Sequence, residues 1–182
     1  MRKTVLILLL LITVSFGVNA ATPVKFMGIP VCGTVPEMAR KLEGKGFEDC
    51  GDNLFQGYFA GELVFAVILA MENRVVGISV GHLCRSESDV VEEYNTIYSK
   101  IIMKNNYYYA KGRKITAKDI SHVSRHFGNE FNTIFYQMAY KNEKFEDCKS
   151  RRVELNLSRR DDLGCWLVTL TYANVDVFDD DY

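Results

Sequence analysis

Two histidines four residues apart form the one arrangement in this sequence that could hold a metal ion. His122 and His126 would share a helix face, and His82 and Cys84 could add ligands if the fold brought them near. Imidazole and thiolate groups are typical zinc ligands. However, the positive charge of Arg125, which lies between them, would repel a metal cation. There is also no His-Glu-x-x-His motif to supply a general base. A metal-binding protein using His122 and His126 is therefore an alternative hypothesis.

Three consecutive tyrosines, Tyr107, Tyr108 and Tyr109, are the candidates for a binding surface. A tyrosine combines apolar area with a polar tip, which suits protein and carbohydrate contacts. Because successive side chains of an extended segment point to opposite faces, the three rings cannot all face a core. We therefore expect either an exposed binding surface, or a loop that packs two rings against a preceding helix.

Enzyme motifs are absent from the sequence. We find no nucleophile elbow, phosphate-binding loop, dinucleotide fingerprint or zincin helix. We therefore expect no catalytic residues and no cofactor. A hydrolase whose site is assembled from scattered residues is the alternative in the enzyme class.

The first 20 residues have the composition of a signal peptide. Arg2 and Lys3 precede the apolar run 5–14, and small residues follow up to Ala20 and Ala21. The run is shorter than the roughly 20 residues that span a bilayer as a helix. We therefore expect cleavage after Ala20 or Ala21, export to the periplasm or medium, and no transmembrane segment in the mature protein.

The net charge of the mature chain limits the classes of partner that it can bind, and its cysteine content determines whether disulfides can form after export. Removing Arg2 and Lys3 with the leader lowers the 22 Lys and Arg to 20, against 23 Asp and Glu, so the mature net charge is about −3. That charge argues against a nucleic acid partner, which requires clustered cations. After export, the oxidising compartment allows disulfides to form. The number of cysteines is odd, so at least one thiol stays free or pairs with another molecule. The five cysteines are Cys32, Cys50, Cys84, Cys148 and Cys165.

Helix signals are clearest in two places. Thr34 with Glu37 forms a capping box before an apolar stripe, and Gly46 supplies a left-handed stop. Ser86 with Asp89 repeats the cap before a stripe made of Val90, Val91, Tyr94, Ile97, Tyr98, Ile101 and Ile102. A short helix is also expected from Thr116, Asp119, Ile120, Val123 and Phe127.

Strand signals follow each of the two main helices. Residues 54–81 predict a three-stranded antiparallel meander, with Leu63 to Met71 as its central strand. Further strands are expected at residues 132–140, 152–158 and 165–172. The order predicts an α+β fold built as a tandem αβββ pseudo-repeat, with amphipathic helices on antiparallel meander sheet. We expect a single globular domain over residues 21–182, with halves at about 26–84 and 85–175. Whether the halves share one sheet is left open.

The start of the mature chain resembles two known groups. Phe26-Met27-Gly28-Ile29-Pro30, Gly33-Thr34 and Leu42-Glu43-Gly44-Lys45-Gly46-Phe47 are similar to the opening of uncharacterised small secreted bacterial proteins. More distantly, the arrangement resembles the fold group of the β-lactamase inhibitor protein and the SmpA/OmlA outer-membrane lipoproteins. The resemblance implies binding to proteins without catalysis. The acylated cysteine of the lipoproteins is absent here.

The sequence therefore favours an exported, non-catalytic binding module, inhibitor-like or associated with the cell envelope. The expected partner is a protein or another envelope component. The hydrolase and the metal-binding protein remain the alternatives.

Overall fold

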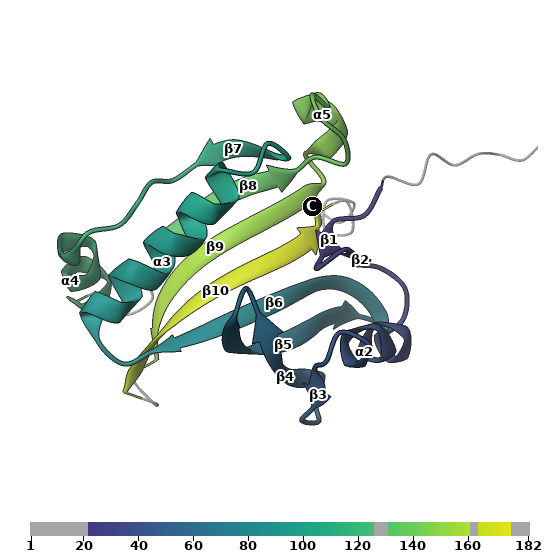
Figure 1. The fold of residues 1–182 in the computed structure, drawn as a ribbon, viewed down its shortest axis with the longest axis horizontal. Helices are drawn as coiled ribbons and strands as arrows, with labels where there is room; N and C mark the ends of the chain where they lie inside the picture. The colour runs from purple at the N-terminus through teal and green to yellow at the C-terminus, as the bar shows by residue number, and fades with distance from the viewer. Residues whose placement is uncertain (1–21, 126–130, 161–163, 176–182) are drawn as a thin grey trace, which may run out of the picture.

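A computed structural model describes residues 22–125, 131–160 and 164–175, and within them eight antiparallel strands form one sheet. Figure 1 shows β6 and β10 side by side in the middle of this sheet. A separate two-stranded sheet pairs β1 (Lys25–Phe26) with β2 (Ile29–Pro30). In spatial order, the large sheet consists of β3 (Glu48–Asp49), β4 (Leu54–Phe59), β5 (Glu62–Met71), β6 (Arg74–Cys84), β10 (Cys165–Asn174), β9 (Arg151–Arg160), β8 (Phe131–Gln137) and β7 (Tyr107–Lys111).

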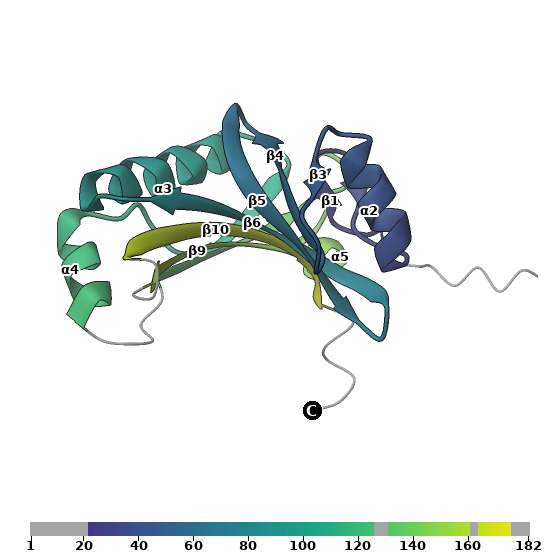
Figure 2. The ribbon, with the colours of Figure 1, turned by 90° about the horizontal axis from the view of Figure 1, so that it is seen from below.

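Two helices lie against the same face of the large sheet. Helix α2 (Val35–Glu43) contacts β3, β5 and β6, whereas α3 (Glu87–Ile102) contacts β6, β7, β9 and β10. Buried residues of both helices join those of the strands in one hydrophobic cluster. Figure 2 shows α3 to one side of β9 and β10. The predicted α+β class is confirmed.

Local capping interactions begin both helices where the sequence predicts them. The backbone N–H of Thr34 donates to Glu37 Oε2 at 2.9 Å, and the N–H of Asp89 donates to Ser86 Oγ at 3.1 Å. Each bond satisfies a backbone donor that the first helical turn leaves free. After α2, Gly46 has φ of +85°, which is the predicted left-handed stop.

The central pairing of β6 with β10 answers the question of whether the halves share one sheet. The strands β4, β5 and β6 form the meander predicted for residues 54–81. Strand β6 then pairs with β10 from Trp166 opposite Cys84 to Ala173 opposite Gly77. The two halves are therefore continuous through their last strands.

The strand expected at residues 132–140 is shorter, and Tyr140 does not belong to it. Strand β8 ends at Gln137, and Tyr140 is 61% exposed. The chain turns there because Glu143 is buried and accepts a hydrogen bond from the N–H of Ala139 at 2.6 Å. The residues of β8 that face the core are those between the expected apolar positions, namely Thr133, Phe135 and Gln137.

The segment between α3 and β8 contains one strand that the sequence did not predict. Tyr107 to Lys111 form β7, which pairs with β8 at the edge of the sheet. The short helix expected after Thr116 is confirmed as α4 (Ala117–Arg125). Its expected last apolar residue, Phe127, lies outside the described residues.

Asp119 connects the first turn of α4 to the preceding residues, and its substitution gives a pH-dependent prediction. The guanidinium of Arg113 and the N–H and hydroxyl of Thr116 donate to this carboxylate, and they hold the pKa of Asp119 well below its usual range. A depressed pKa in the folded state stabilises the fold above the unfolded pKa, and that stabilisation is lost as the pH falls.

We expect Asp119→Asn to lower the free energy of unfolding at pH 7 by about 1 kcal/mol. The difference from the wild-type protein should shrink steadily below about pH 4, where the unfolded carboxylate binds a proton. Urea unfolding at a series of pH values measures it. A difference that stays constant between pH 7 and pH 2 would contradict this role for the carboxylate.

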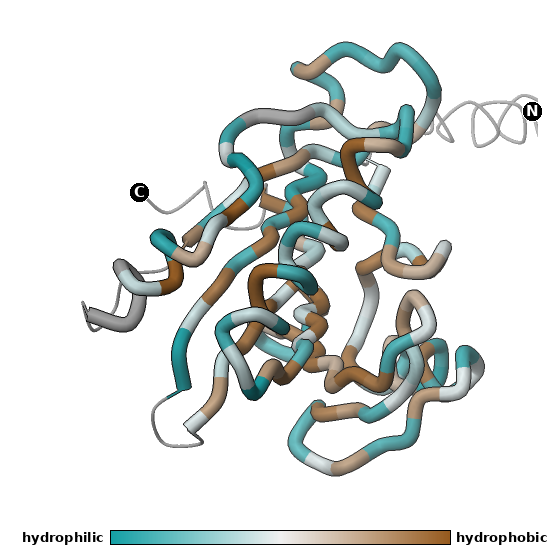
Figure 3. Tube along the Cα trace, turned by 60° about the vertical axis from the view of Figure 1, so that its left-hand side comes forward, coloured by the Kyte–Doolittle hydropathy of each residue, from teal (hydrophilic) through white to brown (hydrophobic). Residues whose placement is uncertain are grey.

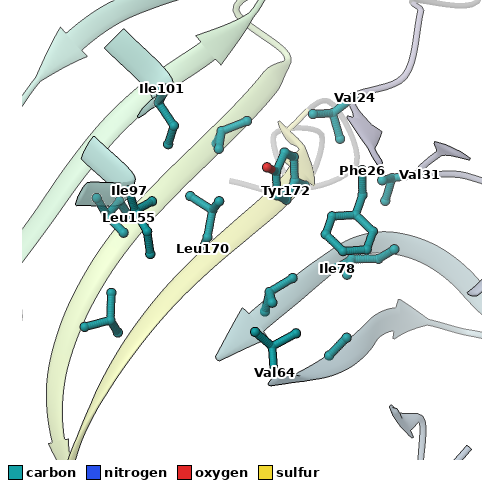
Figure 4. Packing of buried hydrophobic residues seen from close by; sticks show 14 of the residues in the cluster. Val24, Phe26, Val31, Val64, Ile78, Ile97, Ile101, Leu155, Leu170 and Tyr172 are labelled. Atoms are coloured by element: carbon teal, nitrogen blue, oxygen red, sulfur yellow. The ribbon is translucent and has the colours of Figure 1, made fainter. Parts of the chain in front are cut away.

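Side-chain hydrogen bonds attach the N-terminal segment to the far end of β10. Asn174 accepts from the N–H of Val24 at 2.8 Å and donates to the carbonyl of Val31 at 2.6 Å. This places Phe26 in the core, where its ring centroid lies 5.4 Å from that of Tyr172. Figure 4 shows Val24, Phe26 and Val31 grouped beside Ile78 and Tyr172.

All five cysteines lie within the described residues, and all are free thiols in this structure. Cys84 and Cys148 are buried, Cys165 is half-buried, and Cys32 and Cys50 are exposed.

Among the residues that the structure describes, none of the helices has the length and apolar character needed to span a bilayer.

Candidate functional site

A groove runs between α3 and the β4–β5 hairpin, above β6 and β10. It consists of a central slot of about 60 Å³ with a larger hollow at each end, of about 490 Å³ and 540 Å³. The slot shares His82 and Glu93 with the first hollow, and shares Phe59 and Tyr107 with the second, so the slot adjoins both hollows. Strand β6 thus contributes His82, and α3 contributes Glu93, to one site.

His82 and Glu93 form a hydrogen-bonded dyad at the slot. The Nδ1 atom of His82 lies 2.9 Å from Glu93 Oε1. The His82 side chain is 7% exposed and that of Glu93 is 24% exposed. The hydrogen bond from His82, with a further contribution from Lys100, lowers the pKa of Glu93, so the carboxylate is ionised at neutral pH. The other ring nitrogen, Nε2, is buried and has no hydrogen-bond partner among the described residues.

Tyr107 occupies the other end of the slot and belongs to a buried polar network. Gln137 Nε2 donates to Tyr107 Oη and to the carbonyl of Lys25, both at 3.0 Å. The N–H of Lys25 donates back to Gln137 Oε1 at 2.6 Å. Burial raises the pKa of both Tyr107 and Tyr172, so the two phenols stay protonated well above neutral pH. The network fixes the Tyr107 ring at the groove.

The three consecutive tyrosines do not form one surface. Tyr107 pairs with Gln137 on the helix-covered face, whereas Tyr108 pairs with Tyr136 on the opposite face. There, Phe145 of the short helix α5 (Phe145–Cys148) packs edge-on against Tyr108 and Tyr136, with ring centroids 5.9 Å and 5.0 Å away. The side chain of Tyr109 lies outside what the structure describes.

The proposed metal ligands are placed only in part. The backbone of His122 belongs to α4, but its side chain and all of His126 lie outside the described residues. Within the described side chains, no group of three or more His, Cys, Asp or Glu is arranged to hold a metal ion. The metal hypothesis stays a prediction.

The face of the sheet opposite α2 and α3 carries large apolar side chains. Tyr58 and Leu63 oppose each other on β4 and β5 and are 67% and 54% exposed. Leu83 on β6 is 51% exposed and opposes Leu167 on β10. Phe65, which is two residues after Leu63, is 37% exposed on the same face. We call these five side chains the open face.

Glycines of β6 allow this face to be closely packed. A Cβ atom at Gly81 would lie 3.1 Å from Leu167 Cδ1, and one at Gly77 would lie 3.2 Å from Leu69 Cδ1. The leucines of the flanking strands therefore occupy the space above the glycines. Figure 3 shows apolar residues recurring along the strands of the sheet.

Sequence reasoning missed both the dyad and the open face. Glu93 does not belong to the expected apolar stripe of α3 (Val90, Val91, Tyr94, Ile97, Tyr98, Ile101 and Ile102), and His82 was considered only as a further metal ligand together with Cys84. Glu93 lies eleven positions after His82, across the change from strand to helix, so no local spacing links them. The one available signal for the open face was the row of small residues Gly77, Ser79 and Gly81 alternating with the buried residues of β6.

Comparison with known proteins gave no match for this chain among family models, curated proteins or solved structures.

Proposed function

We propose that this chain is an exported, non-catalytic binding module whose open face docks a folded protein of the cell envelope. The observation that carries the proposal is the exposure of Tyr58, Leu63 and Leu83 on the sheet face that α2 and α3 leave bare. Contiguous large apolar residues of this kind mark interaction surfaces in soluble proteins.

The composition of the open face resembles the centre and rim of a protein interface. Aromatic and aliphatic side chains lie over β4, β5 and β6, and polar side chains follow on the same face of β10 and β9. These include Thr169, Thr171, Arg152 and Glu154. An apolar centre beside a polar margin is typical of specific interfaces. The apolar residues would supply the affinity, and the polar ones would orient the partner.

Association free energy favours a broad partner over a peptide. Complete burial of each large side chain contributes about 1.5–3 kcal/mol. Association itself costs roughly 4–15 kcal/mol in lost translational and rotational freedom. The half-exposed residues of the open face overcome that cost only if the partner covers the surrounding surface as well. A folded protein surface meets this requirement.

The order of elements supports the same proposal. Helix α2 precedes β4, β5 and β6, with the short β3 added in the first half, and α3 precedes β8, β9 and β10, with β7, α4 and α5 inserted in the second half. We interpret this order as the tandem αβββ pseudo-repeat, which resembles the β-lactamase inhibitor group. The likeness suggests an inhibitor-like or envelope-associated role.

Export is part of the proposal and has its own test. When the full chain is expressed in a bacterium with a general secretion system, we expect the mature protein in the periplasm or medium, beginning at Ala21 or Thr22. N-terminal sequencing of the purified protein identifies the cleavage site. Retention in the cytoplasm with Met1 and Arg2 still present would exclude an exported module.

Affinity capture tests the binding function. The mature protein and a Leu83→Asp variant are immobilised separately and exposed to detergent-solubilised envelope of the source cells. We expect one protein to be retained saturably by the wild-type bait and lost from the variant. Identical sets of retained proteins on both baits would remove the open face as the docking surface.

A further inference from the structure

The hollow at the Tyr107 end of the groove is bordered by a fixed hydrogen-bond network. The backbone of Lys25 orients the side-chain amide of Gln137, because Oε1 accepts from the Lys25 N–H and Nε2 donates to the Lys25 carbonyl. The second N–H of Nε2 therefore donates to Tyr107 Oη, at 3.0 Å. Tyr107 and Tyr172 are also hydrogen-bonded to each other through their hydroxyls.

One of the two phenol protons in this network has no acceptor among the described residues. Each hydroxyl has a single proton, so only one of the two phenols can donate to the other. The remaining proton cannot go to Gln137, whose amide presents an N–H to Tyr107. Both tyrosines line the hollow, and Tyr107 is only half-buried. Figure 4 shows the Tyr172 hydroxyl on the side of its ring away from Phe26. The network thus offers one spare O–H donor to a ligand in the hollow.

The charged side chains that line this hollow are all positive. Lys25 of β1 and Lys104, which follows α3, are exposed, and neither has an ion-pair partner among the described residues. Arg151 also lines the hollow, but its ion pair with Glu143 balances its charge. No Asp or Glu occurs among the described residues that line it. Two uncompensated ammonium groups therefore border the same space as the spare O–H.

We propose that this hollow binds the phosphate monoester group of a small organic molecule. At neutral pH such a group carries a charge of about −1.5 to −2, which matches the two ammonium groups. Its terminal oxygens accept hydrogen bonds, whereas Lys25, Lys104 and the spare phenol O–H can only donate. A carboxylate would balance just one of the ammonium groups, and an amine would be repelled by both.

Apolar side chains of the same hollow provide contacts for the organic part of the ligand. Phe59 of β4, Met27 between β1 and β2, and Met138 after β8 line it. The Phe59 ring is stacked on Phe26 of the core, with centroids 5.3 Å apart, so its position is fixed. The hollow of about 540 Å³ has the size of a small-molecule site. An aryl phosphate therefore fits this site better than inorganic phosphate does. None of the open-face residues takes part.

Nuclear magnetic resonance titration of the mature protein with phenyl phosphate tests the proposal. The side-chain amide signals of Gln137 report on the site, because this group bonds to Tyr107. We expect phenyl phosphate to shift them saturably and 2-phenylethylamine to leave them unchanged. Benzoate should bind at least about tenfold more weakly, because it balances one ammonium group instead of two. Benzoate or inorganic phosphate binding as tightly as phenyl phosphate would overturn the assignment to an organic phosphate.

Lysine variants with a matched control separate the proposed contacts from an effect of net charge. Lys25→Gln and Lys104→Gln should each weaken phenyl phosphate binding about fivefold or more, since each removes one charge-assisted hydrogen bond. Lys41→Gln removes the same charge at an exposed position of α2 that does not line the hollow. It should change the affinity less than about twofold, because solvent ions screen a distant charge. Equal losses in Lys104→Gln and Lys41→Gln would overturn the proposal.

Discussion

Leu83→Asp is expected to weaken binding of the envelope partner at least about a hundredfold while leaving the fold intact. Leu83 is half-exposed, so its removal costs little packing in the free protein. In the complex, the new carboxylate would be buried against apolar neighbours such as Leu167 and would lose its hydration. Interface positions of this kind typically contribute 2 kcal/mol or more, and about 2.8 kcal/mol corresponds to a hundredfold. Calorimetric titration with the captured partner measures the change.

A matched control for this prediction is Met103→Asp. Met103 is 82% exposed and follows the last turn of α3, away from the open face. The same change of chemistry there should alter affinity less than about twofold, because exposed positions outside an interface contribute little. Equal losses for the two variants would mean that the partner responds to net charge.

Glu143→Ala is expected to lower the free energy of unfolding by about 3 kcal/mol, the largest stability loss that we expect from removing a single charged side chain. Glu143 and Arg151 form an ion pair whose side chains are 5% and 3% exposed. Arg151 also donates to the carbonyls of Gln137, at 2.7 Å, and Thr22, at 3.3 Å. Without Glu143, the guanidinium keeps its charge inside the protein with no counter-ion. Urea unfolding followed by circular dichroism at pH 7 measures the loss.

The exposed pair of Glu146 and Lys149 provides the control for the buried pair. These side chains are 73% and 60% exposed, and their charged atoms lie 3.2 Å apart. Lys149→Ala should change the free energy of unfolding by less than about 0.5 kcal/mol, because water screens the attraction and the free side chains gain entropy. If Glu143→Ala cost no more than Lys149→Ala, the buried pair would not hold β8, β9 and the N-terminal segment together.

Local signals in the sequence predicted the main helices and the first meander. The caps at Thr34 and Ser86 and the stop at Gly46 depend on bonds between residues three or four apart, so the sequence alone identifies them. In the meander 54–81, tight turns fix the neighbours of each strand. These elements could be predicted because each depends on its own residues.

Pairings between distant residues could not be predicted. The β6–β10 pairing joins segments about 90 residues apart, and no turn sets its register. Asn174 and Gln137 fix the N-terminal segment through single amide side chains, which leave no periodic pattern. Strand β7 was missed because tyrosine suits both the core and the surface. The pairing of β7 with β8 decides which tyrosine of β7 faces the core and which faces the opposite side of the sheet.

The open face shows how a correct strand prediction can miss a site. Residues Leu63 to Met71 were predicted as a central strand because they are almost wholly apolar, and β5 does lie between β4 and β6. An apolar run suggests burial on both faces, yet only one face of β5 is buried. Val64, Ala66 and Ile68 face the core, whereas Leu63 and Phe65 are exposed. An apolar strand with one bare face is therefore the feature that marks this surface for a partner.

Site-specific photo-cross-linking is the most direct test of docking through the open face. A photoreactive phenylalanine analogue is placed at Phe65, on the open face, or at Lys41, which is exposed on α2 behind the sheet. After irradiation with the captured partner, we expect a covalent adduct from position 65 and none from position 41. An adduct from position 41 alone would place the partner on the helix side of the sheet and contradict the proposed function.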